Sequence, residues 1–332
     1  QISISNTPPN NSPNHLINNV LVGGGITISN VSFTGDNQQI GAFNSGNSIG
    51  MDSGIVMSSG HALDADLGGS PNSANTPASG IQCSTNPNTI CNDLYMVANL
   101  VPGMVGQGFS VSSINDMCVL EFDFVPYSDT VAFNYVFGSE EYPEYAPPES
   151  STYNDVFGFF ISGPGILGYQ NIAQLPNGNG VVSINNVNPI TNAQYYIYNG
   201  IGNNAPWNSS DQYIQYDGYT KVLKAVSEVQ CGETYHLVIA IADVGDGSWD
   251  SGIFLEANSL TSPTPVEINY TVSSELFANP NWIAEGCVTA TVTLERETNI
   301  NQSLTVPLII SGSATNEVDY TGIPNSITFN PG

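Results

Sequence analysis

Three glutamates stand close together near the middle of the chain, directly after an apolar segment. Glu140, Glu141 and Glu144 follow the letters YVFGS at residues 135–139. The whole sequence has 3 Lys and Arg against 29 Asp and Glu, so few cations are available to neutralise them. Two like charges about 4 Å apart repel by about 4 kcal/mol at an effective dielectric constant of about 20. These carboxylates must therefore remain hydrated, take up protons or bind a metal ion.

Acidic and amide side chains recur beside other apolar segments and extend this group. The candidate metal ligands are Glu140, Glu141, Glu144, Asn154, Asp155, Asp243, Asp246 and Asp250. Calcium binds six to eight oxygen atoms in a tolerant geometry, and loops at the ends of strands can supply them. We therefore expect a metal site with Ca2+ as the cofactor. In the alternative interpretation, the carboxylates accept backbone N–H groups in turns and need no cation.

The acidic loop at residues 243–252 differs from an EF-hand. When Asp246 is taken as position one, Ser251 stands at position six, where the EF-hand has Gly. Ala257 stands at position twelve, where the EF-hand has Glu. We therefore interpret this segment as an acidic loop that connects two strands.

Few residues suit hydrolytic catalysis. The chain has 3 histidines, and His236 alternates with Tyr235 and Leu237, which is typical of a residue on one face of a sheet. A glycosidase needs two carboxylates that flank one bond, whereas adjacent strand residues such as Glu140 and Glu141 point to opposite faces. We predict that the protein is not an enzyme, and a secreted hydrolase is the least favoured alternative.

Aromatic residues are concentrated in a later segment that is rich in Gly and Asn. They include Tyr195, Tyr196, Tyr198, Trp207, Tyr213 and Tyr216. Binding functions tend to lie on such surface loops, and exposed rings can stack on sugars. A calcium-dependent glycan-binding lectin domain is therefore the alternative function. The competing interpretation is that these rings pack the segment onto the rest of the domain.

The charge balance excludes whole classes of partner. A net charge of -26 leaves no cluster of Lys and Arg for nucleic-acid phosphates or anionic lipids. Only 10% of the residues are charged, while Asn, Ser, Thr and Gly are abundant, and this composition favours a β-rich exported protein. The chain begins at Gln1 and has no apolar run of about 20 residues, so we expect an extracellular, cell-surface chain whose signal peptide has been removed.

Five cysteines permit two disulfide bonds in an oxidising compartment. We expect Cys83 to pair with Cys91, because the two are close in a loop, and Cys118 to pair with Cys231. Buried free thiols are an equal alternative for the second pair, since spacing alone does not fix the pairing.

Alternation of apolar and polar residues predicts a chain made mainly of strands. In residues 118–125, Cys118, Leu120 and Phe122 alternate with Glu121 and Asp123. Further strands are expected at 130–137, 156–162, 181–184, 194–198, 219–226, 235–242 and 252–257. Short helices are expected after residue 12 and at 92–100. The pattern predicts a mostly β fold, an antiparallel β-sandwich with long loop insertions and one or two short helices.

Two prolines within residues 262–265 break this pattern and predict a stiff linker. We expect an N-terminal arm at 1–13, a β domain at 14–261 and an immunoglobulin-like β-sandwich at 266–332. The last of these is one or two strands short of a complete sandwich, so we expect the natural protein to continue.

Several motifs follow one another in a specific order. They are LEFDF at 120–124, YVFGSEEY at 135–142, NDVFGFFISGPG at 154–165, CGETYH at 231–236, and the segments 241–243 and 250–257. Together with shorter segments at 31–35, 40–43 and 53–60, they resemble the choice-of-anchor L domain over roughly residues 14 to 260. The remainder resembles the first part of a Calx-beta repeat, through EG at 285–286, VDY at 318–320 and FNPG at 329–332.

The resemblance implies an exported bacterial surface protein. Choice-of-anchor L domains occur in secreted bacterial proteins, and Calx-beta repeats are common in long adhesins that bind calcium. By this resemblance the chain is the N-terminal part of a large adhesin of the type 9 secreted, gliding-motility kind. We expect a non-enzymatic, calcium-stabilised cell-surface adhesin module, whose partners are surface glycans or other cell-surface and secretion-machinery proteins.

Overall fold

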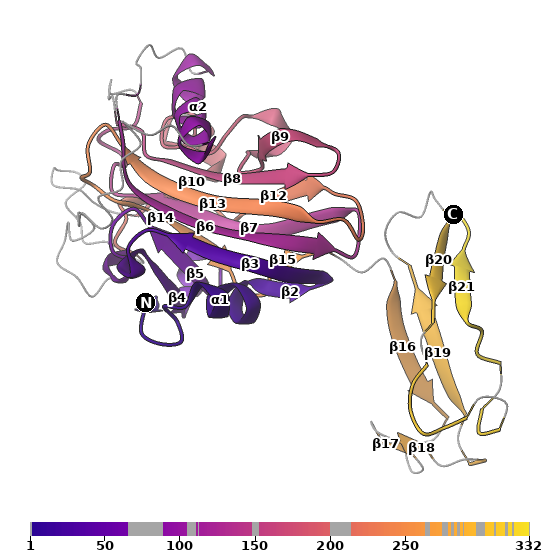
Figure 1. The fold of residues 1–332 in the computed structure, drawn as a ribbon. Coiled ribbons are helices and arrows are strands. Elements are labelled where there is room, and N and C mark those ends of the chain that lie inside the picture. Colours follow the sequence, from indigo (N-terminus) through magenta and orange to yellow (C-terminus); the bar gives the residue numbers. More distant parts are fainter. Residues whose placement is uncertain are drawn as a thin grey trace. The chain divides into compact units, whose positions relative to one another are not determined.

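The computed structural model divides into two units, Gln1–Pro263 and Thr264–Gly332 (Figure 1). The division falls inside the segment expected to be a linker. In the first unit the structure describes residues 2–65, 89–104, 111, 113–147, 153–199 and 214–262. In the second it describes 266–273, 278–279, 282–283, 286–287, 289–296, 303–308, 310–315, 318–320 and 322–331.

One sheet of the first unit has five antiparallel strands. Their order is β3 (Ile26–Thr34), β6 (Ile114–Pro126), β13 (Tyr235–Val244), β8 (Val156–Gly163) and β9 (Ile166–Asn171). On β13, Ile239 faces Leu120 of β6 on one side and Phe159 of β8 on the other. β13 is therefore the central strand of this smaller sheet.

The larger sheet is assembled around β7. Its path is β1 (Ser3–Ser5), β4 (Ile40–Asn44), β5 (Ser53–Ser58), β14 (Ser251–Glu256), β7 (Thr130–Ser139), β11 (Gly218–Thr220) and β10 (Tyr196–Tyr198). β12 (Leu223–Glu228) also pairs with β7, and β15 (Leu260–Thr261) pairs with β7 and with β2 (Val22–Gly24). Ser3–Ser5, which lie in the segment expected to be an arm, pair with β4 and belong to this sheet.

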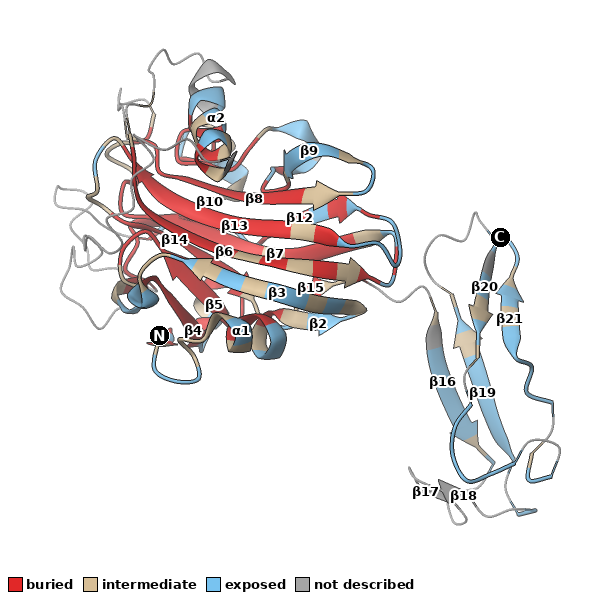
Figure 2. Cartoon of the chain, in the orientation of Figure 1, coloured by how far each residue is buried: buried red, intermediate tan, exposed pale blue. Residues whose placement is uncertain are grey.

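The two sheets face each other across an apolar core, which is coloured as buried in Figure 2. Phe137 of β7 stacks on Phe157 of β8 with ring centroids 4.7 Å apart, and Phe133 meets Phe159 edge-on at 4.9 Å. Aromatic pairs of this kind contribute about 0.5–1.5 kcal/mol beyond the burial of their surface. The predicted antiparallel β-sandwich is confirmed.

Helix α2 (Thr89–Met104) covers the outer face of the smaller sheet. Leu94 and Ala98 of the helix share a second apolar core with Val238 and Ala240 of β13. The helix is longer than the predicted segment 92–100 at both ends. Cys91, in its first turn, is disulfide-bonded, and its expected partner Cys83 lies outside the described residues.

The predicted helix after residue 12 is also present. Ser12 is its N-cap, and Ser12 Oγ accepts a hydrogen bond from the backbone N–H of His15 at 3.4 Å. The helix α1 (Pro13–His15) continues as a π-helix over Leu16–Leu21. Short 3-10 helices lie at Asn37–Gln39, Gly46–Ile49, Ala62–Ala65, Pro176–Gly178 and Ala193–Tyr195.

The end of the first unit is anchored beside β7. Ser262 is fully buried, and its backbone N–H donates to Gly24 O at 3.1 Å. Its Oγ accepts from the backbone N–H of Ser128 at 3.0 Å. Gly25 has a φ of 67° and lies so close to Ser262 O that a Cβ would not fit. The last described residue of this unit is therefore held from two sides.

The second unit consists of antiparallel strand pairs. β16 (Glu267–Val272) pairs with β19 (Ala290–Glu295), β17 (Ala278–Asn279) with β18 (Trp282–Ile283), and β20 (Leu304–Pro307) with β21 (Ser326–Phe329). Ile268 and Tyr270 are 66% and 62% exposed. The described part of this unit is β-rich, as expected, but it buries little apolar surface.

The predicted disulfide between Cys118 and Cys231 is wrong, because both cysteines are free thiols. Cys118 is buried on β6, whereas Cys231 is exposed and precedes β13. The start of β13, Tyr235, pairs with Phe124, which lies six residues along β6 from Cys118. At about 3.4 Å per residue this is about 20 Å, whereas a disulfide spans Cα atoms no more than about 7 Å apart.

The predicted strand at 181–184 is also wrong. Val181 makes an isolated bridge with Gln174, and the chain then turns. The Asn188 side chain donates to Ile184 O at 3.0 Å and accepts from the backbone N–H of Thr191 at 2.8 Å. Side-chain hydrogen bonds to the backbone therefore replace the strand ladder in this segment.

Candidate functional site

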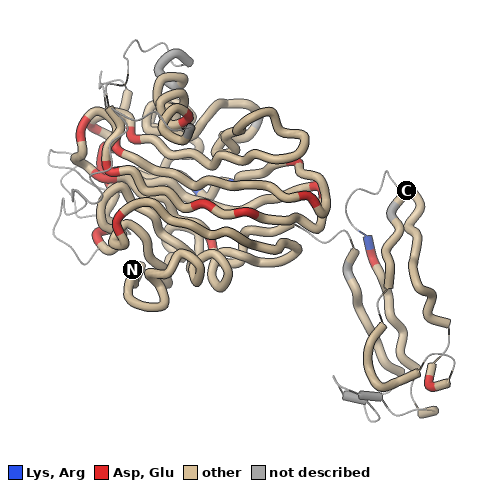
Figure 3. Tube along the Cα trace, in the orientation of Figure 1, with Lys and Arg blue, Asp and Glu red and all other residues tan. Residues whose placement is uncertain are grey.

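An acidic cluster lies where four strands of the two sheets end. It comprises Glu140 and Glu141 directly after β7, Asp155 directly before β8, Asp243 near the end of β13, and Asp250 directly before β14. Figure 3 shows acidic residues gathered at this end of the first unit. The cluster draws on both sheets, since β7 and β14 belong to the larger and β8 and β13 to the smaller.

Strand alternation turns Asp155 and Asp243 toward the space between the sheets. Asp155 is in phase with the core residue Phe157, and Asp243 is in phase with Ile241. Ser251 at the start of β14 donates its hydroxyl to Asp155 Oδ2 at 2.6 Å. This hydrogen bond joins the two sheets at the end of the core.

A β-bulge lies beside Asp243. The two steps from Ile241 to Asp243 on β13 face three steps on β6, from Cys118 to Asn115. The extra length of β6 includes Asp116, whose φ is 48°. Asp116 is 5% exposed and adds to the repulsion that raises the pKa of Asp243. Bulges commonly redirect side chains next to functional sites, and this one brings a further carboxylate to the cluster.

Hydrogen bonds hold part of the cluster without a cation. Asp155 Oδ1 accepts from the backbone N–H of Val244 at 3.1 Å. Glu141 Oε2 accepts from the backbone N–H of Asp155 at 3.3 Å, and the backbone N–H of Glu140 donates to Asp250 O at 3.1 Å. For Asp155 and Glu141, this is the arrangement expected of carboxylates that serve as turn residues.

Asp243 has a different environment. The residue is 1% exposed, and neither of its carboxylate oxygens has a hydrogen-bond partner of good geometry. Burial and the nearby carboxylates of Asp155 and Asp250 raise the pKa of Asp243 well above its usual range, and Ser59 opposes part of the shift. An ionised carboxylate in such a place carries a large desolvation penalty. Asp243 must therefore hold a proton or face a cation.

The same causes act on the rest of the cluster. Burial raises the pKa of Asp155 to about 8, with a further rise from Asp250 and opposition from the Ser251 and Val244 hydrogen bonds. Burial and the Asp155 carboxylate raise the pKa of Glu141 well above its usual range. No Lys or Arg contributes to these shifts. The described part of the chain supplies no basic side chain to balance the cluster.

The oxygen atoms of the cluster are of the kind that calcium binds. All five residues offer carboxylate oxygens, the ligands that Ca2+ prefers, and neither oxygen of Asp243 makes a hydrogen bond of good geometry. Within the described residues, no three His, Cys, Asp or Glu side chains are arranged as an assembled metal site. The residues therefore fit calcium by chemistry, and their side chains would have to rotate to surround the ion.

Three further predicted ligands lie at the margin of the cluster. Asn154 is fully buried, but its Oδ1 accepts from the backbone N–H of Asn185 at 3.1 Å. Asp246 is exposed, and its Oδ1 accepts a backbone N–H two residues later at 3.0 Å. Glu144 is partly buried and contributes to the raised pKa of Tyr196. Asn154 and Asp246 therefore support the surrounding loops.

The aromatic residues predicted as a ligand surface are largely packed onto the domain. Tyr195 and Tyr196 are partly buried against the core between the sheets. Tyr198 is 36% exposed, whereas Trp207 and Tyr213 lie outside the described residues. The described rings therefore favour packing over a platform for sugars.

Tyr216, the sixth ring of that set, lies at the acidic cluster. It is fully buried, and its hydroxyl is 3.1 Å from Ser58 Oγ. Burial raises the pKa of Tyr216, Asp250 and Glu140 raise it further, and the hydrogen bond to Ser58 opposes the shift. A Cβ at Gly252 would lie 2.4 Å from the Tyr216 hydroxyl, so glycine permits this packing. Tyr216 therefore presents no surface to a ligand.

Sequence reasoning missed the residues that contact Asp250 and Ser251, on the side of the cluster formed by the larger sheet. Ser59 Oγ accepts from the backbone N–H of Ser251 at 2.9 Å, and Ser59 N–H donates to Ser251 O at 3.0 Å. A Cβ at Gly60 would lie 1.8 Å from Asp250 Oδ2. These residues follow β5, and only the pairing of β5 with β14 brings them to the cluster. The motif at 53–60 was the one available signal.

His236 lies away from the cluster, on the outer face of β13, as its alternation predicted. Its Nδ1 is 2.7 Å from Asp123 Oδ1, and its Nε2 is 3.4 Å from Glu121 Oε2. The nearby hydroxyl of Ser32 donates to Glu121 Oε1 at 2.8 Å. Carboxylates thus flank both imidazole nitrogens, and Ser32 is not placed as a nucleophile for His236.

Residues 46–50 match the spelling G-x-S-x-G, the nucleophile elbow of many hydrolases. They form a 3-10 turn, Gly46–Ile49, between β4 and β5, whereas the elbow requires a turn from a strand into a helix. Ser48 Oγ is buried without a hydrogen-bond partner. This serine therefore has no base to activate it.

The fold and the cluster define a class of protein, a β-sandwich with an acidic end and no assembled hydrolytic site among its described residues. The model of the choice-of-anchor L domain family matches residues 3–261, and the chain therefore belongs to this family. The family consists of non-catalytic domains of exported, surface-exposed proteins, so the chain is a cell-surface anchoring or adhesin-like module. No curated protein and no solved structure matches it. Among the described residues, no helix is long and apolar enough to cross a membrane.

Proposed function

We propose that the chain is a calcium-stabilised, non-enzymatic module of a bacterial cell-surface adhesin. The observation that carries this proposal is the acidic cluster, in which Asp243 is buried and neither of its carboxylate oxygens has a hydrogen-bond partner of good geometry. Ca2+ bound there would neutralise the repulsion among the carboxylates. In a cell-surface environment, free calcium is the hard cation that an all-oxygen site would recruit.

The residues of the chain have distinct parts in this proposal. Asp155 and Glu141 keep the loops in place through their hydrogen bonds from Val244, Ser251 and the Asp155 backbone. Asp243 supplies the oxygens that are not committed to the protein. Filling the site would tie the loop after β7 to the loop between β13 and β14. Calcium would therefore stiffen the end of the domain at which the two sheets meet.

The second unit extends the proposal to a longer protein. Its β-rich strand pairs and the motifs at 285–286, 318–320 and 329–332 support a Calx-beta repeat that follows the first domain. We propose that the chain is part of a large exported adhesin of the type 9 secreted kind. Its partners would be surface glycans or proteins of the cell surface and the secretion machinery.

The test is the thermal midpoint of the chain in EDTA, in millimolar Ca2+ and in millimolar Mg2+. A ligand present at 100 times its dissociation constant adds about 2.7 kcal/mol of stability. We expect an upward shift with calcium and little with magnesium, which retains its waters and demands octahedral geometry. An unchanged midpoint, with no metal in elemental analysis, would show that the cluster is balanced by protons and would overturn the calcium proposal.

A further inference from the structure

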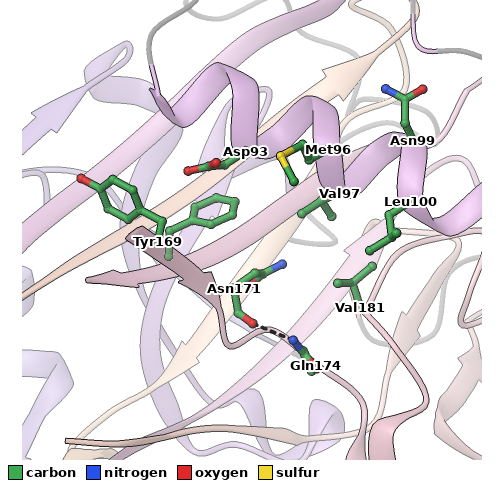
Figure 4. A pocket seen from close by; sticks show the side chains of 10 residues that line it. Asp93, Met96, Val97, Asn99, Leu100, Tyr169, Asn171, Gln174 and Val181 are labelled. Atoms are coloured by element: carbon green, nitrogen blue, oxygen red, sulfur yellow. Dashed lines mark hydrogen bonds between the residues drawn. The ribbon is translucent and has the colours of Figure 1, made fainter. Parts of the chain in front are cut away.

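A pocket separate from the acidic cluster lies between α2 and the edge of the smaller sheet (Figure 4). Its volume is about 480 Å³, within the range of about 300–1,000 Å³ that is usual for ligand sites. Asp93, Met96, Val97 and Leu100 line it from the helix at positions i, i+3, i+4 and i+7. This spacing places them on one helix face.

The walls of the pocket are apolar and open to solvent. Met96 is 69% exposed and Leu100 54% exposed, although both are large hydrophobic side chains. Tyr169 of β9, on the opposite wall, is 37% exposed. Figure 4 shows the helix residues on one side of the pocket and Tyr169 and Asn171 on the other. An amphipathic ligand would bury all three of these exposed side chains.

Two residues that line the pocket each have a polar atom without a hydrogen-bond partner. Asp93 Oδ2 is buried and accepts no hydrogen bond, and burial raises the pKa of Asp93. Asn171 Oδ1 accepts from the backbone N–H groups of Phe159 and Ala173, which fixes the orientation of its amide. Asn171 Nδ2 is buried and donates to nothing. The lining residues therefore include one carboxylate acceptor and one amide donor that the protein itself does not use, beside apolar walls.

We propose that this pocket binds a lysine or arginine side chain, with its adjoining peptide carbonyl, on a partner protein. The aliphatic stem of such a side chain would lie on Met96 and Leu100, and its cationic head would reach Asp93 and the face of Tyr169. The peptide carbonyl would accept from Asn171 Nδ2. The net charge of -26 favours a basic partner, because it attracts cations from a distance. This inference rests on the proposed adhesive function.

The test uses the full chain and two amidated pentapeptides, Ala-Leu-Lys-Leu-Ala and Ala-Leu-Gln-Leu-Ala, titrated by NMR or calorimetry. We expect the lysine peptide to bind about tenfold or more tightly than the glutamine peptide. The glutamine peptide lacks the cation that would make a charged hydrogen bond with Asp93. Asp93→Asn should weaken the lysine peptide by a similar factor and leave the glutamine peptide unchanged. Glu228→Gln removes the same charge from an exposed site on β12, and should leave both affinities unchanged.

Several outcomes would overturn the inference. They are equal affinity for the two peptides, a loss in Glu228→Gln as large as that in Asp93→Asn, or binding of neutral disaccharides such as lactose or maltose in place of peptides. A Leu100→Ser variant provides a second check on the wall, because the lysine peptide should then bind several-fold less tightly. Each titration is repeated in EDTA and in calcium, so that a failed peptide site with an intact calcium shift removes this inference alone.

Discussion

Strands β6 and β13 carry carboxylates in two settings, and the two settings have opposite chemistry. On the outer face of the sheet, Asn30 Nδ2 donates to Asp123 Oδ2 at 2.7 Å, and this bond and His236 hold the pKa of Asp123 below its usual value. At the end of the core, burial and other carboxylates raise the pKa of Asp243. The number of acidic residues therefore says little about a site, because partners and burial decide its charge.

The largest contrast is expected from removing one carboxylate from each setting. Asp155→Ala leaves the buried Val244 N–H and Ser251 hydroxyl without their acceptor. Each unsatisfied donor should lower the free energy of unfolding by about 1–3 kcal/mol. Urea unfolding at pH 5, below the pKa of about 8 of Asp155, should show this loss. Asp123→Ala on the exposed face should cost about 1 kcal/mol or less. Equal losses would remove the distinction between the two settings.

The next effect separates calcium binding from structural support. Asp243→Asn preserves shape but removes a carboxylate that makes no hydrogen bond of good geometry, so the calcium shift of about 2.7 kcal/mol at saturating metal should disappear. In EDTA at pH 8 the variant should be more stable than the natural chain, because folding no longer has to protonate Asp243 or bury its charge. Glu121→Gln is the matched control and should retain the full shift. A calcium shift that survives in Asp243→Asn would place the metal elsewhere.

The dependence of stability on pH should follow from the raised pKa values. Between the unfolded pKa of about 4 and the folded pKa of about 8 for Asp155, the folded state binds more protons than the unfolded state. The contribution of Asp155 to the free energy of unfolding in EDTA is therefore greatest below about pH 4 to 5. It falls by about 1.4 kcal/mol per pH unit as the pH rises toward 8. Calcium should flatten the curve and bind more tightly at pH 8 than at pH 6. A metal-free chain that gains stability over this range would contradict the assignment.

The smallest effect is expected at His236. It is flanked by Asp123 and Glu121, but all three side chains are partly exposed, and exposed ion pairs contribute about 0–1 kcal/mol. His236→Gln should therefore change the free energy of unfolding by less than about 1 kcal/mol, as measured in urea with and without 0.5 M salt. A larger loss would give the outer face a structural role comparable to that of the cluster.

The sequence was sufficient to predict the strands that follow strict alternation and the carboxylates at their ends. Residues 118–125 lie within β6, and the acidic residues after β7 and before β8 lie at one end of the sandwich. The alternation reports which face of a strand is buried, and strand ends in an antiparallel sandwich lie together.

Other features depend on contacts between distant segments and had no local signal. The bulge that brings in Asp116 is a mismatch of register between two strands. Tyr216 looked like a surface ring, because composition does not reveal that Gly252 leaves room for it in the interior. The pairing of Cys118 with Cys231 failed because the sequence does not show that the two thiols lie near opposite ends of the β6–β13 pair.

The anchoring of Ser262 has a mechanical consequence. The chain leaves the first unit through a serine that is hydrogen-bonded to Gly24 and Ser128, next to a β15 that pairs with β7. A pull on the second unit would therefore load this junction first and pass into β7, the strand on which the larger sheet is built. Tension on the chain would thus be spread through the middle of that sheet, away from the N-terminal strand β1, which lies at the far end of the sheet.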